Sequence, residues 1–126
     1  MLNQSEVRIT SGATRKTILV DEKNSTAVSC IINDTAVEAN ADGRKIVKAG
    51  TPLTGNLKDR AAAFATTADA SNVVGIAMHD VDVTAGSANG AILIFGTVDY
   101  SKLDASVQTA LTAEIEKALK MIQFIV

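Results

Sequence analysis

The sequence predicts a mainly β fold, a β-rich α+β domain built from short strands. Three observations support this prediction: short β-branched runs separated by turn residues, the strong strand pattern of residues 73–100, and sustained helical spacing only near the C-terminus. With 126 residues, the chain has the length of one domain, since domains commonly take roughly 100 to 200 residues. We expect a flexible N-terminal arm over residues 1–16 and a single domain over residues 17–126.

The arm is polar and has no sustained hydrophobic period. Val7 and Ile9 are its only spaced apolar pair before Gly12. Two interpretations remain open: a frayed polar terminus, or an arm that becomes ordered on a partner surface. In the second interpretation, Val7 and Ile9 are the residues that anchor the arm.

The domain begins with short β-branched runs at residues 18–20 and 28–32, and polar residues separate them. This pattern predicts two strands joined by a turn. Cys30 lies inside the second run, so we expect a buried, unreactive thiol. It is the only cysteine of the chain, which excludes an intrachain disulfide.

The next segments predict a turn at Asp42-Gly43, a short strand at residues 46–48 and a strand start or sheet edge at Pro52. Proline has no N–H to donate to a sheet, which confines it to such positions. Residues 56–65 carry apolar side chains at helical spacing and three consecutive alanines. They predict one short helix, with Asn56 as its N-cap.

The central stretch starts with a strand at residues 73–78. Continuing its alternation would place Asp80 and Asp82 on the same face as Ile76. Either the strand bends near His79, or its first half is covered on both sides. After a turn cluster, residues 91–95 are apolar without alternation, which predicts burial on both faces.

The C-terminal part predicts one helix over about residues 105–120, with Asp104 as its N-cap. Its apolar residues recur at steps of three and four: Val107, Leu111, Ile115, and Ala118 or Leu119. Lys117 and Lys120 complement the negative end of the helix dipole. Residues 121–126 are too apolar to extend into water, so we expect them to dock as a final strand or extended segment.

Composition argues against several kinds of partner. Twelve basic and fourteen acidic residues give a formal charge of -2, which disfavours nucleic acid as a partner. No apolar run reaches the length of a membrane span, so no membrane partner is expected. Aromatic residues make up 3% of the chain, and this scarcity disfavours a site that stacks sugars or bases.

His79, Asp80 and Asp82 form the only grouping with metal-binding or acid–base character. In a strand, the two carboxylates share one face and His79 points away, so the three cannot converge without a bulge. A metal-dependent hydrolase at these residues is the weakest of the functions considered. We therefore predict no catalytic residue, no metal ligand and no cofactor, and expect that the protein is not an enzyme.

Three segments carry a resemblance to a known family: KAGTPLTG at residues 48–55, VGIA at 74–77 followed by DVDV at 80–83, and AILIFGTV at 91–98. In this order and at this spacing, they resemble the head decoration proteins of tailed bacteriophages. The similarity covers roughly residues 46–126. The N-terminal third matches only as a polar arm followed by short strands.

The resemblance implies a structural virion protein, made in the host cytoplasm, that binds the capsid exterior and stabilises the head. It further implies a homotrimer at the three-fold positions of the expanded capsid, with the major capsid protein as partner. In that family the N-terminal arm becomes ordered on the capsid, and residues 1–16 occupy the corresponding place. The C-terminal helix and apolar tail also fit the base domain of a phage head fibre. A host-surface or glycan-binding module is a further alternative.

Overall fold

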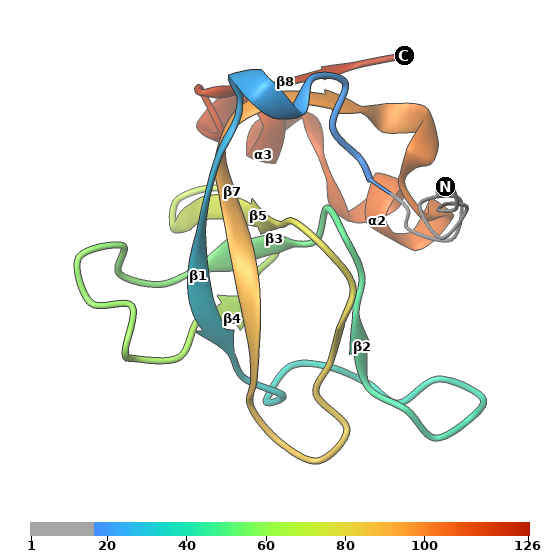
Figure 1. Ribbon diagram of the computed structural model, residues 1–126. Helices are drawn as coiled ribbons and strands as arrows, with labels where there is room; N and C mark the ends of the chain where they lie inside the picture. Colours follow the sequence, from blue (N-terminus) through green and yellow to red (C-terminus); the bar gives the residue numbers. More distant parts are fainter. Residues whose placement is uncertain (1–16) are drawn as a thin grey trace, which may run out of the picture.

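One long strand, β7 (Ala88–Asp99), organises the molecule, which is described by a computed structural model for residues 17–126 (Figure 1). All other elements are short, and the predicted mainly β fold is confirmed. The remaining strands are β1 (Thr26–Ile32), β2 (Ile46–Val47), β3 (Pro52–Thr54), β4 (Ala65–Thr66), β5 (Val73–Ala77), β6 (Val81–Asp82) and β8 (Ile122–Ile125). The helices are α2 (Ala105–Ala110) and α3 (Ala113–Ala118), with 3-10 turns η1 (Glu22–Asn24) and η2 (Tyr100–Lys102).

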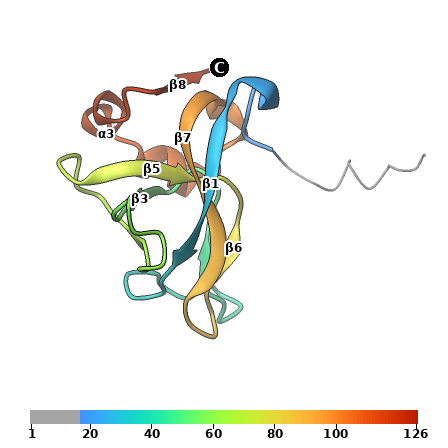
Figure 2. The same cartoon turned by 60° about the vertical axis from the view of Figure 1, so that its left-hand side comes forward.

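The main sheet has six strands in the order β1-β7-β5-β3-β4, and β8 also pairs with β7. β1 runs antiparallel to the first part of β7, from Ile32 opposite Ala88 to Thr26 opposite Phe95. β5 and β3 turn away from the direction of β1 and β7 (Figure 2). Accordingly, β5 pairs with β7 at only two positions. A second sheet of two strands, β2 and β6, completes the β structure of the described residues.

β8 is parallel to β7, with Gly96 opposite Ile122 and Asp99 opposite Ile125. Parallel neighbours cannot be joined by a tight turn and need a crossover of a dozen or more residues. The two α-helices supply this crossover, and they lie beneath β8 in Figure 1. The prediction that the apolar C-terminal residues dock as a final strand is confirmed.

The single helix predicted over residues 105–120 is wrong, because the segment folds as two short helices. Leu111 is the C-cap of α2 and leaves the helical conformation, with a ψ of 79°. Thr112 is the N-cap of α3: its backbone is extended, and its hydroxyl accepts from the Ile115 N–H at 3.3 Å. Such a local hydrogen bond competes with continuation of the helix. The predicted N-cap is confirmed, since Asp104 accepts from the Ser106 N–H at 3.2 Å.

The short helix predicted over residues 56–65 is also wrong. The Asn56 side chain accepts from the Lys58 N–H at 2.9 Å, which closes a turn and caps no helix. Phe64 is fully buried, and its N–H donates to the Ile31 carbonyl at 2.7 Å. Burying Phe64 against β1 requires extended backbone there, so tertiary packing overrides the local helical pattern.

The other strand predictions mostly hold. β1 contains the predicted run at residues 28–32, whereas residues 18–20 form only a single bridge, between Leu19 and Val98. Pro52 begins β3, as predicted. The chain bends at His79, because β5 ends at Ala77 and the next strand, β6, belongs to the other sheet.

Two apolar clusters lie on either side of the central sheet. The helix cluster consists of Ile18, Leu19, Ile76, Leu93, Val98, Leu103, Val107, Leu111, Ile115, Leu119 and Ile122. The loop cluster consists of Cys30, Ile32, Val47, Leu53, Phe64, Ala77, Val81, Val83 and Ile92. The chain thus covers both faces of the middle of β7 with its own residues.

Burial on both faces was predicted for the whole run 91–95. Ile92 and Leu93 are fully buried as predicted, but Ala91 and Ile94 are only partly buried and Phe95 is 42% exposed. Phe95 lies opposite Thr26, the exposed first residue of β1, where the sheet offers little cover. Gly96 follows with a φ of +151°, a backbone conformation that side chains disfavour.

Candidate interaction surfaces

The carboxylates of Asp80 and Asp82, which the sequence groups with His79, have different partners. The Asp80 carboxylate accepts from the Ala49 N–H at 2.8 Å, while Asp82 lies in β6 and interacts with Thr84 and Arg44. Within residues 17–126, no three His, Cys, Asp or Glu side chains are close enough to hold a metal ion. The two carboxylates instead fix loops to the small sheet.

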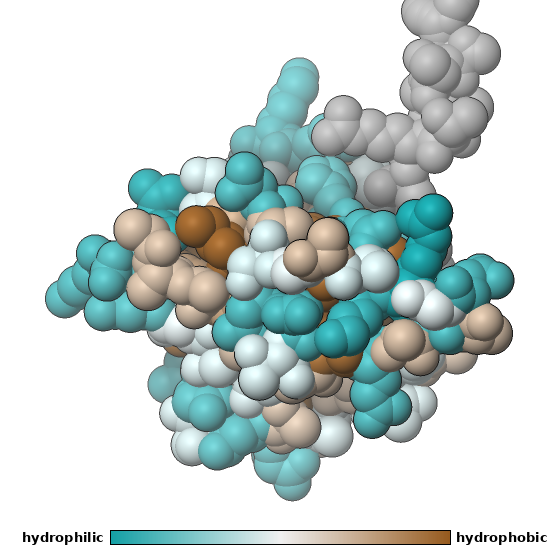
Figure 3. Space-filling model, turned by 90° about the horizontal axis from the view of Figure 1, so that it is seen from below, coloured by the Kyte–Doolittle hydropathy of each residue, from teal (hydrophilic) through white to brown (hydrophobic). Residues whose placement is uncertain are grey.

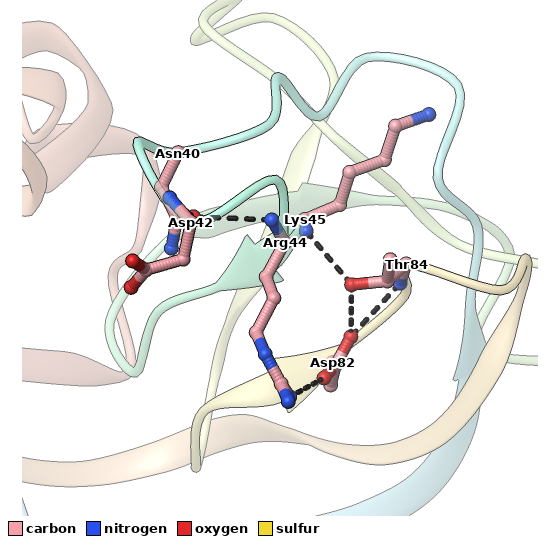
Figure 4. Close-up of polar contacts among 6 residues, drawn as sticks. All are labelled: Asn40, Asp42, Arg44, Lys45, Asp82 and Thr84. Atoms are coloured by element: carbon pink, nitrogen blue, oxygen red, sulfur yellow. Dashed lines mark hydrogen bonds and ion pairs between the residues drawn. The ribbon is translucent and has the colours of Figure 1, made fainter.

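Asp82 is the centre of a polar network that joins the two loops beside β2 and β6 (Figure 4). Its carboxylate accepts from the N–H and the hydroxyl of Thr84 and forms an ion pair with Arg44 at 3.1 Å. The Thr84 hydroxyl accepts from the Lys45 N–H at 2.9 Å. The pKa of Asp82 is lower than its ordinary value, and the hydrogen bond from the Thr84 hydroxyl is the main cause. A hydrogen bond donated to a carboxylate favours its charged form.

Cys30 is buried in the loop cluster, as predicted. Burial raises the pKa of its thiol, and the nearby Arg60 charge opposes this effect only in part. Since the thiolate is the reactive form, a raised pKa keeps the group unreactive at neutral pH. The position therefore serves packing.

The end of the molecule that carries β8 exposes apolar side chains. The large exposed ones at this end are Val20, Phe95, Met121, Ile125 and Val126. The Val20 N–H donates to the Thr97 carbonyl, the Gly96 N–H donates to the Met121 carbonyl, and Ile125 lies opposite Asp99. These side chains therefore lie around the end of β7, where residues 18–20 and β8 are hydrogen-bonded to it. We call this region the apolar end.

The opposite end is different in character. Seen from below, it is mostly hydrophilic or neutral, with hydrophobic areas only in small separate places (Figure 3). Exposed hydrophobic side chains are ordinary when scattered, but a gathered set indicates an interaction surface. The apolar end is therefore the first candidate surface.

The second candidate surface is a groove between β2, the loop before it and α2, with a volume of about 590 Å³. Its apolar lining includes Val37, Ile46, Pro52, Val107 and Ala110. We call it the α2–β2 groove. Pockets of this size with mainly apolar walls are typical of binding sites.

The groove was not predicted from the sequence, because its walls come from segments far apart in the chain. In the sequence, Val107 was identified only as one residue of the helical repeat, and this repeat predicts burial but no binding site. Glu38, Arg44 and Lys48 add charge at its sides. Arg44 pairs with Asp82, and Lys48 lies 4.0 Å from a carboxylate oxygen of Asp104.

The predicted anchors Val7 and Ile9 lie outside the described residues. The structure does describe the point where the arm joins the domain, at residues 17 and 18. The Ile18 carbonyl accepts from the Asp99 N–H at 2.8 Å, and Asp99 is paired with Ile125. The arm thus leaves the domain at the apolar end.

Among residues 17–126, no helix is both long and apolar enough to cross a bilayer. No protein-family model matches the chain, and no curated protein matches its sequence. The geometry of the two surfaces, together with the resemblance noted in the sequence, is thus the basis for a functional proposal.

Proposed function

We propose that this protein is a structural virion component that binds the outer surface of a phage capsid and stabilises the head. Its partners are the major capsid protein and further copies of itself, arranged as a homotrimer. The proposed role is played by distributed contacts and requires no catalytic group, cofactor, nucleic acid or membrane. The three sequence segments that resemble decoration proteins support it.

The observation that carries the proposal is that the described chain starts at the apolar end, so the arm joins the domain there. Thr17 begins the described chain two residues before Leu19, which bridges to Val98 in β7. Val20, Phe95 and Ile125 are exposed around the same strand end. An arm that is attached beside an apolar surface can engage the same partner as that surface, and weak contacts add up when many copies bind a symmetric lattice.

Purified heads without this protein provide the direct test. Added protein should bind them saturably, and decorated heads should withstand a higher temperature before they release DNA. If the protein does not bind and the heads are equally heat-resistant without it, the proposal is wrong.

Two exposed aliphatic residues make a matched pair of variants for the contact surface. Ile125→Asn changes the apolar end, where the side chain is 43% exposed, and Leu57→Asn changes a turn elsewhere, where it is 38% exposed. We expect the first to weaken binding to heads by about tenfold, as for loss of one apolar contact at an interface, and the second to leave it unchanged. Equal affinities for both variants would place the capsid contact elsewhere.

One observation favours the alternative of a host-surface or glycan-binding module. Phe95 is exposed, whereas Phe64 is buried and Tyr100 and Phe124 are partly buried. An exposed ring could stack on a sugar face. A glycan array with the full chain and with Phe95→Leu separates the two functions, because saturable binding lost in the variant would support the alternative.

A further inference from the structure

Val107 of α2 links the α2–β2 groove to the start of the described chain. Ile18 packs in the helix cluster with Val107, and Val107 also lines the groove. We propose that residues 6–10 of the same chain dock in this groove when the protein is free.

The arm is long enough to reach it. The link from Ile9 to Thr17 spans at most about 27 Å when fully extended. Ile18 and Val107 belong to one cluster, and Val107 is a residue of α2 that also lines the groove. An α-helix with its side chains measures roughly 10 to 12 Å across. The link can therefore pass around α2 and still place Val7 and Ile9 in the groove.

The sequence of residues 6–10, EVRIT, has the alternation of an extended segment: Val7 and Ile9 on one side, and polar residues on the other. The groove offers a complementary arrangement. Its walls include Val37, Ile46 and Pro52. β2 borders it and, within the described chain, pairs only with β6. An extended peptide can add to such a strand edge through main-chain hydrogen bonds, with alternate side chains filling apolar pockets.

Charge adds a weaker attraction. Residues 1–16 carry Arg8, Arg15 and Lys16 against Glu6, a formal charge of +2, so the rest of the chain carries -4 within the total of -2. Glu38 lines the groove and provides a carboxylate for Arg8, which would point away from the apolar wall. Arg44 already has Asp82 as its counterion and so need not repel the arm.

Docking within one chain is favoured over docking in a neighbour. A short flexible link holds its own segment at an effective concentration in the millimolar range, well above that of a second copy in dilute solution. The docking concerns the free protein and does not rest on the proposed function. It would occupy Val7 and Ile9, so a partner that binds these residues would have to displace them from the groove.

Hydrogen exchange on the full chain, read by mass spectrometry in the absence of any capsid, tests the docking. We expect amides of residues 7–10 to exchange about tenfold or more slowly than in a variant with a blocked groove. Ala110→Trp blocks the groove with a large side chain at its α2 wall. Ala113→Trp is the matched control, because Ala113 is an exposed helical alanine that does not line the groove.

The double variant Val7→Asp/Ile9→Asp provides a second measurement that leaves the domain itself untouched. It should increase exchange at residues 36–38, at Asn40 and at residues 66–68, which line the groove. Unprotected arm amides in the unaltered chain would overturn the proposal, as would protection that survives Ala110→Trp. Protection that rises with protein concentration would also overturn it, since it would assign the groove to a neighbour's arm.

Discussion

Ile92 and Leu93 are consecutive in β7, yet their side chains belong to different apolar clusters. Leu93 lies opposite Ile76 in the helix cluster, and Ile92 lies opposite Ala77 in the loop cluster. Both side chains are fully buried. The strand is therefore a wall that the two clusters share.

This arrangement predicts how substitutions in β7 combine. Ile92→Val should cost about 1 kcal/mol and Leu93→Ala about 3 kcal/mol, the usual range for buried truncations. Because the two side chains have separate neighbours, the double variant should match the sum within about 0.5 kcal/mol in urea unfolding. Ile76→Val combined with Leu93→Ala is the comparison. These two residues are paired in one cluster, so their losses of unfolding free energy should not add. Strict additivity in both pairs of variants would contradict the two-cluster description.

Gly75 should be intolerant of any side chain. A Cβ there would meet the Leu93 carbonyl oxygen at 2.6 Å and a side-chain carbon of Ile92 at 2.7 Å. Gly75→Ala should therefore cost about 3 kcal/mol or more, at the upper end for overpacking. Gly43→Ala is the control: it has open space around it but a φ of +76°, and it should cost only about 1 kcal/mol. Thermal unfolding of both variants measures the difference, and equal losses would count against the close contact.

Asp82 should make the free energy of unfolding depend on pH in the acid range. Its pKa in the folded protein lies below the ordinary value of 3.8, so the charged form is favoured by folding. The stabilisation is complete above the pKa of the unfolded chain and is lost as the pH falls through the lower pKa of the folded protein. Asp82→Asn should flatten the pH dependence of unfolding below about pH 4.

Two further variants identify the cause of this lowered pKa. The hydrogen bond from the Thr84 hydroxyl is the largest cause, and the Arg44 charge is a smaller one. Carbon-detected NMR titration should therefore show a larger rise in the pKa of Asp82 in Thr84→Ala than in Arg44→Met. A larger rise in the arginine variant would reverse the assignment.

Thr112 should be important as the N-cap of α3. Its hydroxyl accepts from the Ile115 N–H, and removal of such a cap commonly costs about 1 kcal/mol. Thr112→Ala should lower the free energy of unfolding by this amount, while Thr112→Ser, which keeps the hydroxyl, should lose little. If both variants were equally stable, the hydroxyl would have no capping role.

The sequence predicted those features that depend on local pattern. The cap at Asp104 and the docking of the final apolar segment follow from residue type and spacing, and the structure has both. The bend near His79 was one of two alternatives that the pattern left open, and the structure shows the bend. The two failed helices have a common physical reason, since apolar spacing does not reveal which backbone conformation buries the side chains. Val107 and Ile115 face the same cluster from two separate helices, and Phe64 reaches its cluster from extended chain.

The candidate surfaces were harder to predict than the fold. Phe95 is part of an apolar run, and only its position opposite the first residue of β1 explains its exposure. The α2–β2 groove is formed where segments distant in the sequence approach one another, and each contributes only a few residues to it. The arm anchors Val7 and Ile9 remain a prediction, and the hydrogen-exchange experiment addresses them directly.

The shared wall formed by β7 has a consequence for cooperativity. Neither cluster can lose its order without exposing one face of the strand on which the other depends. The two clusters should therefore unfold in one transition, with equal calorimetric and van't Hoff enthalpies. Val47 of the loop cluster and Val107 of the helix cluster both line the groove. Whatever binds there bridges the two clusters, and its binding energy would raise the melting temperature of the whole domain.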